Sequence, residues 1–262
     1  MKIKLYQILN LIGLAGVITV NYLANALPIA GKTTGELSDL YPSLFTPAGF
    51  TFSIWGLIYL LLIIFGVYQS KGLFSNSNIP QNDYLKRIGP WFFISSLANM
   101  AWIFAWHHQV VWLSMLIMLV MLFSLITIYL QLGIDHRIVS KNQRYFVNMP
   151  FSVYLGWITV ATIANAATLL IDLHWGGFGI GQEIWTSLMI SIAAILTLVI
   201  LFTRKDFFYS LVIIWAFVGI IYKRSQPGED FYLSIIITAS AGIFLIAATL
   251  IFQAVKRFVR KG

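Results

Sequence analysis

Aromatic and amide side chains lie deep within the long apolar segments of this chain, and together they could bind a flat molecule. Trp55, Trp102 and Trp157 stand several residues from either end of their segments, as do Asn99 and Asn165. Aromatic faces stack on planar ligands, and a buried amide can hydrogen-bond a polar group on a largely apolar ligand. The alternative interpretation is that the tryptophans only pack and that the amides only join neighbouring helices.

Residue types that serve other site chemistries are absent or lie outside the apolar segments. The chain has no cysteine, which excludes thiol chemistry, disulfides and cysteine-ligated metals. All nine acidic residues fall in predicted loops or at segment ends, which disfavours proton relays and ion-coupled transport. His107, His108 and His174 also lie outside the segments, with no second ligand at helical spacing. We therefore predict neither catalytic residues nor a metal site.

The composition is that of a membrane protein. Hydrophobic residues make up 59% of the 262 residues and charged residues only 10%, whereas about 25% charged residues is usual in soluble domains. The net charge of +8 could suggest nucleic-acid binding. However, the lysines and arginines stand between apolar segments, where membrane topology explains them. We therefore exclude nucleic acid as a partner and expect contact with membrane lipid.

Eight segments are apolar and long enough to be considered as membrane-spanning helices, for which about 20 residues suffice. The predicted fold class is accordingly all-α, a polytopic membrane helical bundle of about eight transmembrane helices. Pro28 should end the first helix, while Pro47, Pro90 and Pro150 should begin the second, third and fifth. The seventh segment is the shortest. The predicted helices span residues 5–27, 47–69, 89–106, 109–132, 148–171, 184–203, 207–222 and 231–255.

The first apolar segment has two interpretations. Lys2 and Lys4 precede it, and Ala24-Asn25-Ala26 fits the small-residue pattern of a signal-peptide cleavage site. However, the apolar run from residue 5 to residue 23 is longer than the usual signal core of about 7–15 residues. This length favours a retained first helix.

The loop charges indicate an orientation. With eight helices, fourteen of the seventeen lysines and arginines fall on the side of the two termini. The other side holds only Lys32, Lys223 and Arg224. Because cytoplasmic loops carry the excess of Lys and Arg, we expect both termini in the cytoplasm.

Three sequence motifs resemble those of the TspO/MBR family, which comprises bacterial tryptophan-rich sensory proteins and the mitochondrial translocator protein, or peripheral benzodiazepine receptor. Residues 41–59, with Tyr41-Pro42-Ser43, Thr46-Pro47 and Ile54-Trp55-Gly56-Leu57-Ile58-Tyr59, are similar to the family's KPSW and PPxWxxxxVWxxLY elements. Residues 97–102 are similar to its LNxAW, and residues 154–165 to its YLAWxxFATxLN. The three occur in the family's order on successive predicted helices.

The resemblance implies two parts. Residues 1–172 would form a five-helix TspO-like transmembrane bundle, with a pocket roofed by the first loop. Residues 173–262 would add three transmembrane helices and a basic cytoplasmic tail. Family ligands include porphyrins, haem, cholesterol and benzodiazepine-like compounds. The resemblance also implies a bacterial cytoplasmic membrane as the location.

Motif matching and helix geometry give the candidate ligand-binding residues. Trp157 and Asn165 lie about 80° apart around their helix and about 12 Å apart along it, and Ala161 between them leaves room for a ligand. Gly49 stands where the family has a tryptophan, with Phe50 beside it. Only Trp157 therefore remains of the tryptophan pair that the family's proposed tetrapyrrole degradation uses. The candidates are Phe50, Trp55, Asn99, Trp102, Trp157, Ala161 and Asn165.

The expected function is that of a non-enzymatic membrane receptor, sensor or transport-modulating protein. It would bind a small, planar, hydrophobic ligand, similar to a porphyrin, haem or a sterol, in the first five helices. It would require no cofactor, although porphyrin or haem could be bound. The alternative is a permease component for a hydrophobic substrate within a larger exporter. The partner would then be a transporter subunit, whereas a receptor could act as a homodimer.

Overall fold

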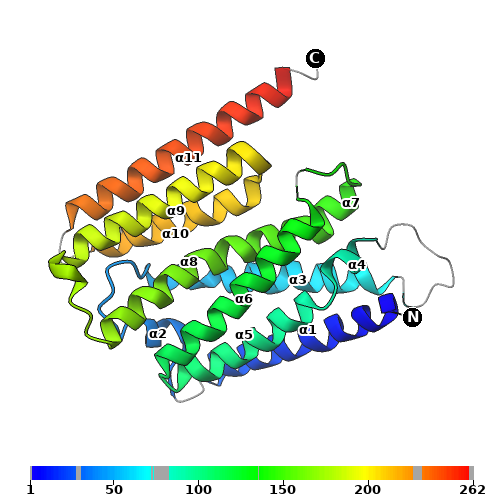
Figure 1. The fold of residues 1–262 in the computed structure, drawn as a ribbon, viewed down its shortest axis with the longest axis horizontal. Coiled ribbons are helices and arrows are strands. Elements are labelled where there is room, and N and C mark those ends of the chain that lie inside the picture. Colours follow the sequence, from blue (N-terminus) through cyan, green and yellow to red (C-terminus); the bar gives the residue numbers. More distant parts are fainter. Residues whose placement is uncertain are drawn as a thin grey trace.

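The chain is built of helices that lie side by side along the long axis of the molecule (Figure 1). The computed structural model describes residues 2–27, 31–71, 73, 83–134, 136–226 and 232–259, without the side chains of Lys2, Arg257 and Phe258. All regular elements in these ranges are helical. The predicted all-α class is therefore confirmed.

Eight long helices correspond to the eight predicted segments. They are α1 (Lys2–Ala26), α3 (Ile54–Ser70), α5 (Trp91–His107), α6 (Val111–Leu132), α8 (Met149–Asp172), α9 (Gln182–Arg204), α10 (Phe207–Arg224) and α11 (Leu233–Val259). Short helical elements lie between them. These are α2 (Thr34–Ser38), the 3-10 helix η2 (Gly49–Ser53), α4 (Asp83–Ile88), α7 (Lys141–Gln143), the π-helix η4 (Arg144–Asn148) and the 3-10 helix η5 (Gly177–Gly179).

Seven of the long helices in the described ranges are both long and apolar enough to cross a membrane. The eighth, α5, has 17 residues and is about 26 Å long, slightly less than the hydrocarbon core of about 30 Å. It nevertheless packs between α1 and α6, so it crosses the molecule with them. The chain is therefore an integral, multi-pass membrane protein.

The first five long helices form a closed ring. In order around this ring, α1 packs on α3, α3 on α8, α8 on α6, α6 on α5, and α5 on α1. We call α1, α3, α5, α6 and α8 the five-helix ring. Its interior contains a chain of hydrogen bonds in which Asn21 donates to Asn99 over 2.7 Å, and Asn99 donates to the Tyr154 hydroxyl over 3.2 Å. These bonds join α1, α5 and α8 inside the ring.

The last three helices, α9, α10 and α11, pack on one another and form the C-terminal unit. Among these three helices, α10 makes the extensive contacts with the rest of the molecule, along α8 of the ring and along η2. Gly156 on α8 permits this contact, because a Cβ there would lie 3.0 Å from the Val212 Cβ and 3.1 Å from the Tyr209 carbonyl oxygen. The family motif has alanine at this position, and here the glycine occurs where α10 packs on α8.

The prolines have more varied roles than predicted. Pro90 is the N-cap of α5 and Pro150 lies in the first turn of α8, as expected. Pro47 lies two residues before the helix that it was expected to begin, because the membrane span runs from Gly49 to Ser70, with η2 as its first turn and α3 from Ile54. Residues near Pro47 instead form the loop that covers the ring. Pro28 lies outside the described residues.

The seventh helix is short but central. α10 has 18 residues, and its membrane-crossing stretch has the largest buried share among the described spans. The reason is its position between α8 on one side and α9 and α11 on the other. Its length of about 27 Å is close to the hydrocarbon thickness.

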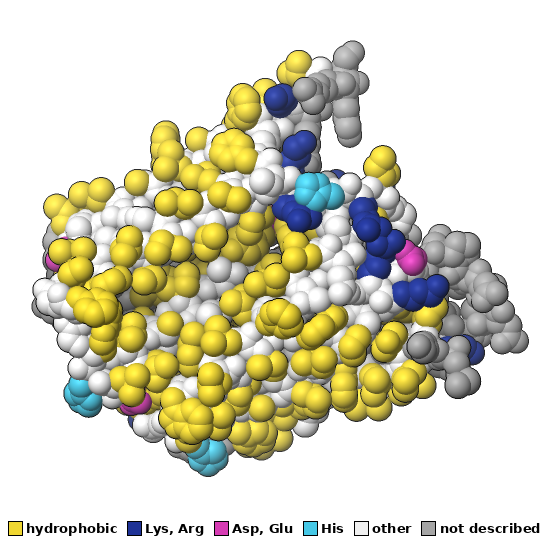
Figure 2. All heavy atoms as spheres, in the orientation of Figure 1, with side chains coloured by type: hydrophobic (Ala, Val, Ile, Leu, Met, Phe, Trp, Pro, Cys, Tyr) yellow, Lys and Arg dark blue, Asp and Glu magenta, His cyan; other side chains and the backbone are white. Residues whose placement is uncertain are grey.

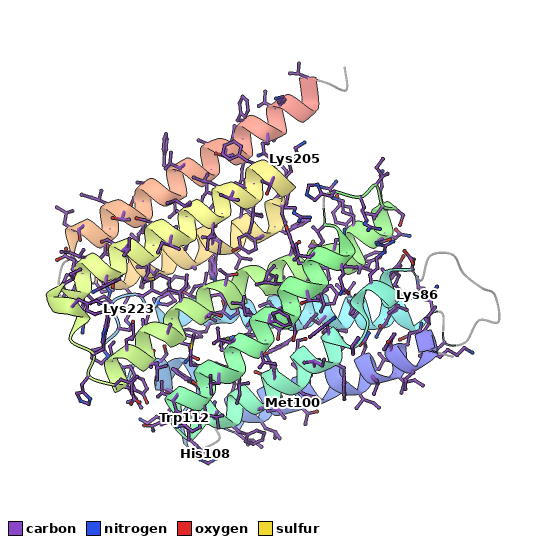
Figure 3. All side chains as sticks on the ribbon, viewed as in Figure 1. Lys86, Met100, His108, Trp112, Lys205 and Lys223 are labelled. Carbon is purple, nitrogen blue, oxygen red and sulfur yellow. The ribbon has the colours of Figure 1, made fainter. Side chains whose placement is uncertain are left out.

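Basic residues gather at one end of the molecule. Figure 2 shows Lys and Arg side chains clustered around α4 and α7, while many apolar side chains are spread over the rest of the visible face. In Figure 3, Lys86 and Lys205 lie toward this basic end, and His108 and Trp112 lie toward the opposite end. The excess of Lys and Arg residues that was predicted for one set of loops is thus found at one end of the helical bundle. Four charged residues at loop and chain ends, Glu229, Asp230, Arg260 and Lys261, lie outside the described residues, as does Asp135.

Candidate functional site

A small cavity lies inside the five-helix ring, at the end opposite the basic cluster. Its top wall comes from residues 31–53, which include α2 and η2 and which we call the roof segment. Its other walls come from α3, α5 and α8. The cavity volume is about 40 Å³. The lining residues are Thr34, Ser38, Pro47, Phe52, Trp55, Trp102, Trp106, Trp157, Val160, Ala161, Ala164, Asn165 and Thr168.

Aromatic rings form most of the wall. Trp55 lies at the centre of this group, with its ring centroid 6.5 Å from that of Trp102 and 6.2 Å from that of Trp157. Trp102 and Trp106 are stacked at 5.7 Å with an interplanar angle of 14°. Phe52 of the roof segment meets Trp157 edge-on at 5.8 Å. Several flat surfaces therefore face one space, an arrangement suited to a planar apolar molecule.

Two indole N–H groups in this wall have no hydrogen-bond partner. Trp102 and Trp157 are 5% and 2% exposed, and the Nε1 atoms of both are buried without an acceptor. A buried indole N–H usually finds an acceptor, and leaving one unpaired costs roughly 1–3 kcal/mol. Both residues line the cavity, while the Nε1 atoms themselves are buried, so an acceptor would reach these two donors only after the wall has shifted.

The roof segment begins with a stable local structure. Thr33 caps α2, because its hydroxyl accepts from the Glu36 amide while the Glu36 carboxylate accepts from the Thr33 amide at 2.7 Å. The carboxylate also accepts from the Thr33 hydroxyl at 2.9 Å. The two hydrogen bonds that it accepts, first of all that from the Thr33 backbone, lower the pKa of Glu36. Next to the cap, Trp106 donates its N–H to the Thr34 carbonyl oxygen at 3.3 Å, and the Thr34 hydroxyl lies 3.3 Å from His107 Nε2. These contacts fix the start of the roof segment on α5.

Five of the seven candidate residues lie in the cavity wall. They are Trp55, Trp102, Trp157, Ala161 and Asn165. Asn165 also exchanges hydrogen bonds with Ser114 on α6 at 3.0 and 3.3 Å. A ligand that hydrogen-bonds the Asn165 amide would therefore share it with Ser114. The position of Asn165 is compatible with both interpretations of the amide, as a ligand contact and as a contact between helices.

Asn99 and Phe50 lie elsewhere. Asn99 is fully buried in the hydrogen-bond chain between Asn21 and Tyr154, and it does not line the cavity. Phe50 points to the C-terminal unit, with its ring edge-on to Trp215 at 5.4 Å and to Tyr222 at 5.2 Å. The structure therefore gives Asn99 a role inside the ring and Phe50 a role at the junction with α10.

Sequence reasoning missed several lining residues. Trp106 follows Trp102 by four residues and so lies on the same helix face, which was a usable signal. Phe52 occupies the wall for which Phe50 was proposed, because the 3-10 geometry of η2 directs the two rings differently. Thr34, Ser38 and Pro47 gave no signal, since their place in the wall depends on how the roof segment crosses the ring.

Two larger hollows lie outside the ring. One, of about 530 Å³, is lined by the ends of α8 and α9, the loop between them and part of the roof segment, including Ser43 and His174. The other, of about 430 Å³, is an apolar groove between α3 and α10. Within the described residues, no group of three or more His, Asp or Glu side chains could hold a metal ion.

Comparison with protein families gives one match. The family model for TSPO-like proteins matches residues 7–252, which is nearly the whole chain. The match crosses the boundary at residue 172 and includes α9, α10 and most of α11, so it extends further than the motifs indicated. Comparison with curated proteins found no match, and neither did comparison with solved structures. On the match over residues 7–252, the chain belongs to the family of TSPO-like proteins.

Proposed function

We propose that this membrane protein binds a flat, largely apolar molecule with hydrogen-bond acceptors, such as a porphyrin, in the cavity of the five-helix ring. The observation that carries the proposal is the pairing of aromatic faces with two unpartnered indole N–H groups, those of Trp102 and Trp157. Aromatic faces suit a planar body, while the indole donors suit carbonyl or carboxylate oxygens. A purely hydrocarbon ligand would leave both donors unpaired.

The cavity volume implies that binding involves opening. A cavity of about 40 Å³ has room for one or two water molecules, whereas ligand pockets usually have about 300–1,000 Å³. Apart from η2, the roof segment is the part of the wall that lies outside the candidate membrane spans. Its displacement would enlarge the cavity without separating the helices of the ring.

We further propose a receptor or transport-modulating role without catalysis, with both termini in the cytoplasm. The indoles and amides of the wall can stack and hydrogen-bond, and none of the described residues that line it carries a titratable side chain that could exchange a proton with a ligand. The basic end of the molecule would face the cytoplasm, because positive loops are retained there. Binding would then take place near the outer surface.

The test is a titration with protoporphyrin, followed by quenching of tryptophan fluorescence in detergent. Trp157→Phe and Trp102→Phe retain aromatic faces and remove one N–H each. Because each N–H lacks a partner in the closed cavity, neither change should lower stability much. Each should weaken binding about fivefold, which corresponds to one hydrogen bond of about 1 kcal/mol. Ala161→Phe should abolish binding, because the added ring occupies the cavity.

Trp112→Phe is the matched control. Trp112 is 57% exposed on α6 and does not line the cavity, so its replacement should leave affinity unchanged. All variants are compared at equal monodispersity. Unchanged protoporphyrin affinity in Ala161→Phe and in both cavity tryptophan variants would rule out this site. Flux of protoporphyrin across proteoliposomes would indicate a permease instead of a receptor.

A further inference from the structure

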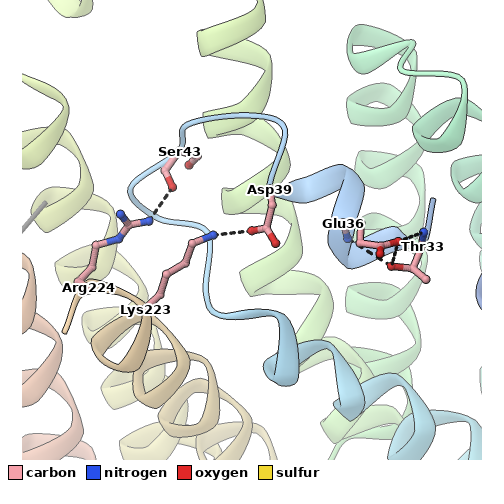
Figure 4. Close-up of polar contacts among 6 residues, drawn as sticks. All are labelled: Thr33, Glu36, Asp39, Ser43, Lys223 and Arg224. Carbon is pink, nitrogen blue, oxygen red and sulfur yellow. Dashed lines mark hydrogen bonds and ion pairs between the residues drawn. The ribbon is translucent and has the colours of Figure 1, made fainter. Parts of the chain in front are cut away.

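The roof segment is attached to α10 through the last turn of that helix. Lys223 Nζ lies 2.6 Å from Asp39 Oδ1, and Arg224 donates from Nη2 to the Ser43 carbonyl oxygen at 3.3 Å (Figure 4). Arg224 is only 4% exposed. A buried guanidinium that hydrogen-bonds a loop carbonyl fixes the position of the loop backbone, in contrast to an ion pair at the surface.

Two more contacts continue along the same face of α10. The Gly219 carbonyl oxygen accepts from the Ala48 amide at 3.1 Å, and Trp215 donates its N–H to the Thr51 carbonyl oxygen at 3.0 Å. Positions 215, 219 and 223 are each four residues apart, so they form one stripe on the helix. This stripe runs along the roof segment from Thr51 back to Asp39.

The close approach requires a glycine on α10. A Cβ at Gly219 would lie 2.0 Å from Thr51 Oγ1 and 3.1 Å from Pro47 Cβ. Pro47 is itself part of the cavity wall. The surface of α10 is therefore shaped to receive the roof segment at the point where that segment closes the cavity.

The second part of the roof segment depends on α10 for its polar contacts. Apart from hydrogen bonds to nearby residues of the chain, such as those from the amides of Asp39, Leu40 and Tyr41 to α2, the described hydrogen bonds and the ion pair of residues 39–51 go to α10. In addition, the hydroxyls of Ser43, Thr46 and Thr51 are buried without partners. Each would gain hydrogen bonds to water if the segment moved outward. The closed position thus carries an internal cost, which the α10 contacts offset.

We propose that the C-terminal end of α10 controls access to the cavity. Lys223 and Arg224 hold the roof segment closed, and a ligand enters or leaves when their contacts break. The proposal rests on the proposed function for the identity of the site, but opening of the roof segment can be measured without a ligand. The C-terminal unit thereby regulates a cavity to which it contributes no lining residue.

The experiment uses the absence of native cysteines. Ala161→Cys places one thiol in the cavity wall, and its rate of modification by a charged methanethiosulfonate reports opening toward water. In this background, Lys223→Met and Asp39→Asn should each raise the rate severalfold. The combined charge exchange Lys223→Asp with Asp39→Lys should restore the original rate. Higher ionic strength should also raise the modification rate, because salt screens the partly exposed ion pair between Lys223 and Asp39.

A second experiment closes the roof segment covalently. Asp39→Cys and Lys223→Cys are joined by a short reducible bis-methanethiosulfonate in the full chain, and protoporphyrin is then added. The joined protein should bind at least tenfold more slowly, and reductant should restore the rate. The matched control joins Asp83→Cys to Arg87→Cys, which replaces an ion pair of 2.5 Å on α4 and should leave the binding rate unchanged.

The outcomes separate the two proposals. Protoporphyrin could fail to bind the wild-type chain while Lys223→Met and Asp39→Asn still raise the modification rate of Ala161→Cys. In that case the proposed ligand class is wrong, and the proposal that α10 controls access to the cavity stands. If the thiol of Ala161→Cys is modified at the same rate with and without Lys223→Met or Asp39→Asn, α10 does not control access to the cavity. Unchanged protoporphyrin binding after cross-linking of residues 39 and 223 would overturn the proposal in the same way.

Discussion

The five-helix ring and the C-terminal unit show two ways of filling the space between membrane helices. In the ring, large side chains such as Trp55, Trp102 and Trp157 occupy the interior and leave a cavity among them. In the C-terminal unit, a Cβ at Gly242 of α11 would lie 2.8 Å from the Phe217 ring and 3.4 Å from the Ala194 Cβ. Small residues there bring α9, α10 and α11 into close contact.

The difference has a geometric cause. Three helices in mutual contact enclose almost no central space, so a single ring such as that of Phe217, packed against Gly242, fills it. Five helices in a ring enclose a centre that no backbone reaches, and only side chains can fill it. A ring is therefore the part that can open a binding site, while a compact unit beside it can serve as a rigid support for the roof segment.

Removal of the C-terminal unit gives the largest expected effect. A chain that ends at Leu173 retains every residue that lines the cavity but loses the α8–α10 contact and all α10 contacts to the roof segment. We expect the ring to remain folded in detergent, with a melting temperature lower by about 10 °C, since several kcal/mol of packing are lost. Protoporphyrin should bind faster. A folded, monodisperse truncate that binds nothing would show that the ring is not autonomous.

Substitution at the junction should have the next largest effect. Gly156→Ala places a methyl group 3.0 Å from the Val212 Cβ, so α8 and α10 must separate at a cost of about 1–3 kcal/mol. Gly56→Ala is the matched control, because a Cβ at Gly56 would meet nothing within 4 Å and alanine favours the helix by up to about 1 kcal/mol. Thermal unfolding in detergent measures both. Equal stability of the two variants would contradict the close α8–α10 contact.

Loss of a polar contact should matter more in the ring than in the C-terminal unit. Asn99→Ala removes the partner of both Asn21 and Tyr154 inside the ring and should cost about 1–2 kcal/mol. Gln253→Ala removes a partly buried hydrogen bond from α11 to the Leu201 carbonyl oxygen and should cost about 0.5 kcal/mol. Both are measured by thermal unfolding. A larger cost for Gln253→Ala would mean that the unit depends on polar contacts.

The smallest expected effect concerns Asp206, whose carboxyl group joins the five-helix ring to the C-terminal unit at the basic end of the molecule. Asp206 caps α10 by accepting from the Phe208 and Tyr209 amides, and it also accepts from Ser152 of α8 at 2.7 Å. Burial raises its pKa above the ordinary value. Its protonated form is therefore favoured by folding, and the associated stability is present at acidic pH and lost as the pH rises through the folded-state pKa.

Asp206→Asn tests this sign. Asparagine caps helices as well as aspartate, and it carries no charge at neutral pH. We expect a stability gain below about 1 kcal/mol at pH 7, measured by thermal unfolding, and no gain below pH of about 3, where the wild-type carboxyl is protonated in both states. A variant that is less stable at pH 7 would show that the charged form of Asp206 is favoured by the fold.

The sequence was sufficient for the helices and for part of the cavity wall. Apolar length alone predicts eight helices, and the alternation of basic loops predicts which ends share a side of the membrane. Family motifs place Trp55, Trp102 and Trp157 on successive helices, and helix periodicity places Ala161 between Trp157 and Asn165. These predictions depend on local chain geometry and on residue type, and both can be read from the order of residues.

Contacts between distant segments were decided only by the tertiary structure. Phe50 and Phe52 are two residues apart, yet one packs on α10 and the other lines the cavity. Asn99 has the expected depth, but Asn21 and Tyr154 satisfy its amide. Likewise, Lys223 and Arg224 look like ordinary loop charges until the roof segment is placed beside them. Which neighbour satisfies a polar group depends on packing between helices, and no local pattern encodes that packing.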